Sequence, residues 1–76
     1  MSVDLLDGLP PATPERIAQA RAAAGLTQTQ AAALVGAKVL AWQRWEGGQR
    51  GMSLDAWALY LLATDQHPTA RVIPTR

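Results

Sequence analysis

The segment Leu26–Gly48, LTQTQAAALVGAKVLAWQRWEGG, decides the fold of this 76-residue chain. Thr27 is followed three residues later by Gln30, which is the spacing of a capping box and predicts the start of a short helix. Gly36 ends that helix, because glycine readily supplies the positive φ of a tight turn. A second helix is predicted over roughly residues 38–47. The segment therefore predicts two short helices joined by a glycine turn.

The second of these helices has an apolar face and a polar face. At about 100° per residue, Trp42 and Trp45 share one side, and Leu40, Gln43 and Arg44 share the other. Tryptophans can stack on the bases of single strands, but the inward phase of this pair favours a role in the core. Two short helices with this polarity have the layout of a helix-turn-helix, which places its second helix in the major groove of DNA.

A helix is predicted on each side of this pair. Thr13-Pro14 opens the first, with threonine as N-cap and proline in the first turn, and Gly25 closes it. Its apolar stripe is Ile17, Ala20 and Ala24.

Ser53 caps the last helix, with Asp55 in its first turn, and we interpret this serine as a cap and not as a nucleophile. This helix ends near residues 64–65, because Pro68 cannot continue it. Its predicted apolar stripe is Leu54, Trp57, Ala58, Leu61 and Leu62. The chain is thus expected to be all-α, a small bundle of four to five helices.

The expected organisation is an arm over residues 1–12, one domain over residues 13–65 and a tail over residues 66–76. The leucines of the arm, Leu5, Leu6 and Leu9, either cover the bundle, form a dimer surface or belong to a disordered end. Val72-Ile73 in the tail is a short extended segment or part of a mobile end, and with the C-terminal end of the last helix it is an apolar candidate for a dimer contact. His67 beside Pro68 is expected to be exposed.

Composition excludes several classes of function. The chain is 49% hydrophobic with a mean hydropathy of −0.02, which is typical of a folded soluble protein. It has no cysteine and one histidine, so disulfides and thiolate metal sites are excluded, and no metal, cofactor, small-molecule ligand or enzymatic activity is expected. No apolar run approaches the ~20 residues of a membrane span, and the acidic N-terminus is unlike a signal peptide, so a cytoplasmic protein without membrane contact is expected.

Positive charge is concentrated around the two short helices. The whole chain has a formal charge of +1, but residues 16–50 contain five Lys or Arg residues against the single acid Glu46. A local field of this sign suits contact with phosphate, although an ordinary solvated surface has the same composition.

The pattern L-T-Q-x-x-x-A-x-x-V-G…W-x-x-W-E-x-G resembles the lambda-repressor-like family of helix-turn-helix proteins, also called Cro-type or XRE-type. The resemblance covers about residues 15–62. Two positions depart from the family pattern: Lys38 replaces a small polar N-cap, and Trp42 replaces a β-branched core residue. Small alanines in the first two helices could make room for Trp42. The residues of the resemblance are Arg21, Leu26, Thr27, Gln28, Ala32, Gly36, Trp45, Glu46 and Gly48.

The resemblance implies a role for particular residues. The helix over residues 38–47 matches the recognition helix. Its positions that face base edges are Val39, Leu40, Gln43 and Arg44. Arginine and glutamine suit guanine and adenine, whereas valine and leucine can make only apolar contacts, for instance with a thymine methyl. The expected phosphate contacts are Gln28, Lys38 and Arg50, and Arg21 and Glu46 match an ion pair between helices.

The function that the resemblance implies is sequence-specific binding of double-stranded DNA by a prokaryotic or phage transcription regulator. We expect a homodimeric repressor that binds an inverted-repeat operator at a phage, plasmid or other mobile-element promoter. The alternative is an antitoxin, which binds both operator DNA and a protein toxin. Residues 65–76 are a short segment for binding a toxin.

Overall fold

Four helices make up the fold of residues 6–70, the part of the chain that the computed structural model describes. They are α1 (Pro14–Ala24), α2 (Gln28–Leu34), α3 (Val39–Glu46) and α4 (Leu54–Ala63). The prediction of a small all-α bundle is confirmed, with four helices. Within residues 6–70 no helix has the length and apolar character needed to cross a membrane. The expectations for Leu5 and Val72-Ile73 concern residues outside the described range.

Three of the helices, α1, α2 and α4, begin where the sequence predicts because side chains satisfy their first amide groups. Thr13 Oγ1 accepts a hydrogen bond from the Arg16 amide at 3.2 Å, and Ser53 Oγ accepts one from the Ala56 amide at 3.2 Å. At α2 the capping box is complete: the Thr27 hydroxyl accepts from the Gln30 amide, and the Gln30 side chain accepts from the Thr27 amide.

A glycine in the left-handed conformation lies at or just after the end of each of the first two helices. Gly25 caps α1 with a φ of 69°, and Gly36 comes after Val35, the C-cap of α2, with a φ of 68°. A side chain with a Cβ is strained in this region, so glycine permits the sharp turns from α1 to α2 and from α2 to α3.

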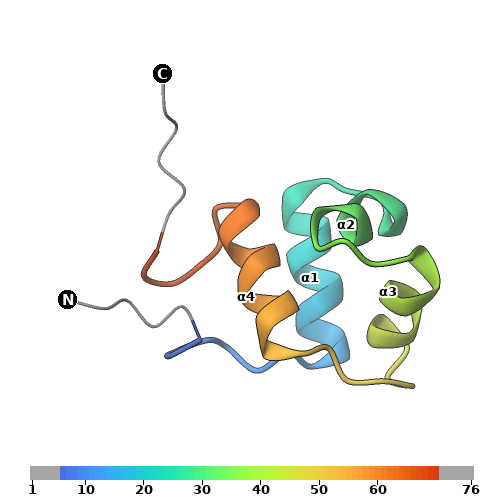
Figure 1. Ribbon diagram of the computed structural model, residues 1–76, viewed down its shortest axis with the longest axis horizontal. Coiled ribbons are helices and arrows are strands. Elements are labelled where there is room, and N and C mark those ends of the chain that lie inside the picture. Colours follow the sequence, from blue (N-terminus) through green and yellow to red (C-terminus); the bar gives the residue numbers. More distant parts are fainter. Residues whose placement is uncertain (1–5, 71–76) are drawn as a thin grey trace.

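Figure 1 shows how the helices are arranged. α1 lies in the middle of the view, with α4 on one side and α3 on the other. α2 packs on α3 and also touches α4, and α3 packs against α1. The two ends of the described chain, coloured blue and red, lie on the α4 side of the bundle, away from α3 (Figure 1).

Aromatic rings are the largest buried side chains of the core: Trp42 of α3 and Tyr60 and Trp57 of α4 are at most 1% exposed. Ala31 and Ala32 of α2 belong to the same buried cluster and are 0% and 1% exposed. Tyr60 of α4 packs on Trp42 with ring centroids 4.9 Å apart. This packing fixes α3 to the rest of the bundle.

The predicted apolar stripe of α4 is wrong at two positions. Leu54 is 55% exposed, whereas Tyr60, which the stripe omits, is fully buried. The Tyr60 hydroxyl donates a hydrogen bond to the Ala20 carbonyl of α1 at 3.1 Å, so its polar atom is satisfied in the interior. The buried face of α4 is rotated toward Tyr60 because both α1 and α3 supply partners on that side.

The prediction of an exposed His67 is also wrong, since this residue is 8% exposed. Its Nδ1 atom accepts hydrogen bonds from the amides of Thr69 and Ala70 at 3.2 and 3.1 Å, which holds a tight turn together. The neighbouring Gln66 donates from Nε2 to the Ala20 carbonyl at 2.9 Å. Contacts with the bundle therefore continue beyond residue 65.

At the other end, residues 9–12 lie against the bundle. Leu9 is half-buried on the core, and the Pro10 carbonyl accepts a hydrogen bond from Trp57 Nε1 at 2.8 Å. Leu6, in contrast, is 40% exposed. For the last residues of the arm, the alternative of covering the bundle is therefore the one that the structure shows.

Candidate nucleic-acid interface

Glu46, the last residue of α3, receives four hydrogen bonds from three side chains. Arg21 of α1 donates from Nε to Oε2 at 2.5 Å and from a terminal nitrogen to Oε1 at 3.1 Å. Trp42 Nε1 donates to Oε2 and Gln28 Nε2 donates to Oε1 at 3.4 Å. Arg21 also donates to the Leu26 carbonyl at 3.1 Å. The expected contact between Arg21 and Glu46 is thus present, and it ties α3 to α1 and to the start of α2.

The ionisation of this pair follows from its geometry. The hydrogen bonds from Arg21 lower the pKa of Glu46 below its ordinary value of 4.5, and the Trp42 bond acts in the same direction, while partial burial opposes them. The hydrogen bond to Glu46 likewise raises the pKa of Arg21. Glu46 is therefore charged at neutral pH, and both of its carboxylate oxygens accept hydrogen bonds from side chains of the protein.

The outer face of α3 is exposed along its length. Leu40 is 52% exposed and Val39 is 36% exposed, and the side chains of Gln43 and Arg44 are also exposed. Val39 and Leu40 therefore offer a partner apolar area to bury, beside the polar groups of Gln43 and Arg44. Of the residues expected to face bases, all four are accessible to a partner.

A shallow pocket of about 250 Å³ lies on one flank of this face, and we call it the cationic pocket. Its lining combines three cations with three apolar side chains: Lys38, Arg44 and Arg50 with Ala37, Leu40 and Ala41. Val39 and Gln43 do not line it. Within residues 6–70, no hydrogen bond or ion pair engages the side chains of the three cations, and no carboxylate lines the pocket.

Backbone structure brings the three cations together. Lys38 is the N-cap of α3 but makes no capping hydrogen bond, as its residue type predicts, so its ammonium group is available to a partner. After α3, the amides of Gln49 and Arg50 donate to the Arg44 carbonyl at 3.0 and 3.3 Å. This fold-back holds Arg50 beside Arg44. From the sequence, Lys38 and Arg50 were expected to contact phosphate and Arg44 to contact bases, but their position in one pocket was not predicted.

Gln28 is placed differently from the other expected phosphate contacts. It is half-buried, and its amide donor points to Glu46. At 3.4 Å this hydrogen bond is long, so a stronger acceptor could replace it.

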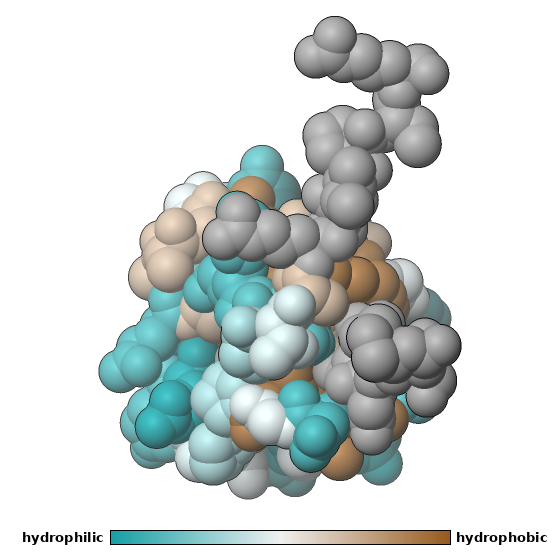
Figure 2. Space-filling view, turned by 90° about the vertical axis from the view of Figure 1, so that its left-hand side faces the viewer, coloured by the Kyte–Doolittle hydropathy of each residue, from teal (hydrophilic) through white to brown (hydrophobic). Residues whose placement is uncertain are grey.

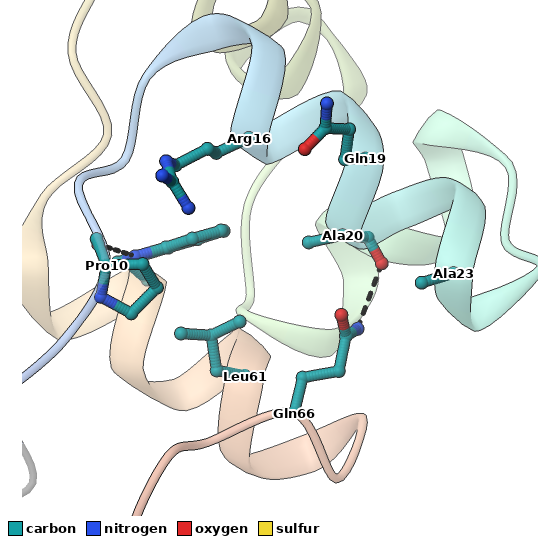
Figure 3. A pocket seen from close by; sticks show the side chains of 8 residues that line it. Pro10, Arg16, Gln19, Ala20, Ala23, Leu61 and Gln66 are labelled. Carbon is teal, nitrogen blue, oxygen red and sulfur yellow. Dashed lines mark hydrogen bonds between the residues drawn. The ribbon is translucent and has the colours of Figure 1, made fainter.

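Two other concavities lie away from α3. One of about 260 Å³ is shown in Figure 3, where Arg16 of α1 and Leu61 of α4 lie on opposite sides of a hollow, with Pro10 at one end and Gln66 at the other. The Gln66 amide group is already used to bind the Ala20 carbonyl (Figure 3). This hollow marks the seam where the two ends of the described chain pack on the bundle.

The other concavity is an apolar groove on the outer face of α4, with a volume of about 290 Å³. It is lined by Leu6, Asp55, Ala58, Leu59 and Leu62. We call it the α4 groove. Figure 2 shows the side of the molecule on which α4 lies, where brown apolar side chains interrupt a mostly hydrophilic surface. Among residues 6–70, no three His, Asp or Glu side chains are grouped in a way that could hold a metal ion.

Comparison with curated proteins finds no match to the chain, whereas comparison with protein families finds one. A family model described as a helix-turn-helix domain matches residues 15–72, which include the cationic pocket and all four helices except Pro14, the first residue of α1. The chain therefore belongs to the helix-turn-helix domain family, in agreement with its resemblance to the lambda-repressor-like proteins.

Proposed function

We propose that this protein is a homodimeric transcription regulator that binds operator DNA with the outer face of α3 in the major groove. The observation that supports this most strongly is the exposed face of α3, flanked by three cations that have no partner within residues 6–70. Duplex DNA offers what this surface needs, namely phosphates at its edges and base edges between them.

The residues on this surface divide into two groups. Lys38 and Arg50 lie at the start of α3 and just beyond its end, where they would neutralise phosphates. Arg44 and Gln43 lie on the helix itself, where their donors and acceptors would meet guanine and adenine in the major groove. Gln28 would join the phosphate group by giving up its long bond to Glu46.

The ion pair behind α3 supports this arrangement. A recognition helix must hold its orientation to select bases, because a small displacement misaligns bidentate hydrogen bonds. Trp42 anchors α3 from inside, and Arg21 fixes its last residue from the side. α3 can therefore present Arg44 from a rigid base.

A homodimer would enlarge the recognition surface. α3 has 8 residues, so one copy spans only a few base pairs, and two copies on an inverted repeat would double the number of contacts. We expect the two recognition helices about 34–36 Å apart, one turn of DNA. The α4 groove, on the side away from α3, is the candidate contact between copies. A repressor bound at a phage, plasmid or other mobile-element promoter in a prokaryotic cytoplasm would fit this design.

Selection of bound sequences from a pool of random DNA duplexes tests the proposal. The expected product is an inverted repeat whose half-sites are centred about 10 base pairs apart. Recovery of random sequence at every salt concentration would contradict sequence-specific binding. Recovery of a single unrepeated site would contradict the dimer and leave DNA binding in place.

A further inference from the structure

We propose that each operator half-site contains a 5-methylpyrimidine next to a guanine, with Leu40 on the methyl group and Arg44 on the guanine. This inference rests on the proposed function and names the feature of DNA that the cationic pocket selects. It starts from one local combination, an exposed leucine that lines the same pocket as three cations.

The apolar part of the pocket would bind an apolar group of the DNA most favourably. Leu40 is 52% exposed, and it lines the pocket together with the methyl groups of Ala37 and Ala41. In the major groove, the C5 methyl group of thymine is the apolar group that a base pair presents, and 5-methylcytosine places the same group on a C·G pair. Cytosine and the purines place no such group there. The apolar lining can therefore distinguish one base from another only by contact with the methyl group of a 5-methylpyrimidine.

Arg44 fixes the neighbour of that pyrimidine. It lies four residues after Leu40, so the two side chains project from the same side of α3 about 6 Å apart along the helix axis. A separation of about 6 Å lies between one and two base steps of about 3.4 Å, and the long side chain of arginine reaches the nearer of the two bases. Its guanidinium group bonds in a bidentate manner to O6 and N7 of guanine, and no protein group within residues 6–70 competes for it.

The two flanking cations set the position of this pair of contacts. Lys38 and Arg50 line the same pocket, so phosphates bound by both would bring the bases between them against Leu40 and Arg44. Val39 and Gln43 lie outside the pocket and would contact other base pairs.

The test uses the full chain and an operator obtained by selection. Each thymine of both half-sites is replaced in turn by uracil, which deletes only the C5 methyl group. At one position next to a guanine, we expect wild-type affinity to fall about fourfold per half-site, the factor expected for one buried methyl group. Replacing that thymine by cytosine should weaken binding, and 5-methylcytosine at the same position should recover about fourfold per half-site.

Leu40→Ala assigns the effect to this side chain. Alanine is an excellent helix former, so α3 should persist, and the variant should bind thymine and uracil operators equally. The matched control is Leu34→Ala, because Leu34 is 43% exposed on α2 and does not line the pocket. This control should keep the fourfold preference for thymine.

The outcomes separate the inference from the proposed function. If wild-type protein binds the operator but tolerates uracil at every position, or if Leu40→Ala retains the preference for the methyl group, the inference is wrong while DNA binding stands. If selection yields no preferred duplex at all, the proposed function itself is wrong.

Discussion

Arg21 of α1 and Glu46 of α3 form a two-point ion pair, with Nε 2.5 Å from Oε2 and a terminal nitrogen 3.1 Å from Oε1. The side chain of Glu46 is only 11% exposed, and Trp42 and Gln28 donate to the same carboxylate. One carboxylate therefore joins three helices behind the surface that is proposed to contact DNA.

Glu46→Gln should destabilise the fold by about 2 kcal/mol. This value lies between the roughly 0–1 kcal/mol of an exposed pair and the 3–5 kcal/mol lost when one partner of a buried pair is removed. Urea unfolding followed by tryptophan fluorescence measures it. Glu15→Gln is the control, because Glu15 is an exposed glutamate in the first turn of α1 and should cost a few tenths of a kcal/mol. Equal effects of the two substitutions would show that the ion pair contributes nothing.

The same carboxylate should make stability depend on pH. Its pKa is lower in the folded protein than the ordinary 4.5, mainly because Arg21 donates to it, so the folded state binds fewer protons than the unfolded state. Its contribution is complete above the unfolded pKa and is lost as the pH falls through the lower folded pKa. The stability difference between wild type and Glu46→Gln should therefore shrink as the pH is lowered below about 4.5. A difference that stays constant down to pH 3 would contradict this assignment.

The α4 groove should hold the dimer together. Leu59 is 47% exposed in the groove, and Leu59→Asp would place a charge in an apolar contact and should shift sedimentation toward the monomer. Leu34→Asp, at a similarly exposed leucine of α2, should leave the oligomeric state unchanged. A dimer that survives Leu59→Asp would place the contact elsewhere.

The sequence predicts local structure well here and long-range contacts less well. Thr13, Thr27 and Ser53 satisfy amides only three residues away, so their capping is visible in the sequence. The burial of Tyr60 depends on the Ala20 carbonyl, 40 residues away, and periodicity within α4 contains no information about it. One signal was available: α4 is apolar around nearly all its circumference, which indicates a helix buried on more than one side.

In the candidate site, too, contacts between distant parts of the chain were harder to predict than local structure. The outward position of Leu40, Gln43 and Arg44 follows from helical phase. The assignment of Val39 to the same face and the Arg21–Glu46 contact follow from the family resemblance. The cationic pocket does not, because it requires the chain after α3 to fold back so that Arg50 reaches Arg44. His67 was misjudged for a related reason, since it accepts hydrogen bonds from a turn that a short loop sequence does not specify.

Lys38→Ala should weaken binding to all duplexes alike. Lys38 is proposed to contact phosphate, so its loss removes counterion release and not base selection. The slope of log affinity against log salt should fall in magnitude by about one unit per contact, or two for a dimer. Unequal effects on the operator and on random DNA would mean that Lys38 contacts bases.

The central claim is that α3 recognises the operator, and the most direct measurement is the affinity of Arg44→Ala for the selected operator and for its single-base-pair variants. Arg44 is exposed and free of protein partners within residues 6–70, so the substitution should leave the fold intact. The account predicts a loss of roughly 1–3 kcal/mol per half-site and a relaxed preference at one base pair, with preferences elsewhere unchanged. Unchanged affinity together with an unchanged preference at every position would show that α3 is not the recognition helix.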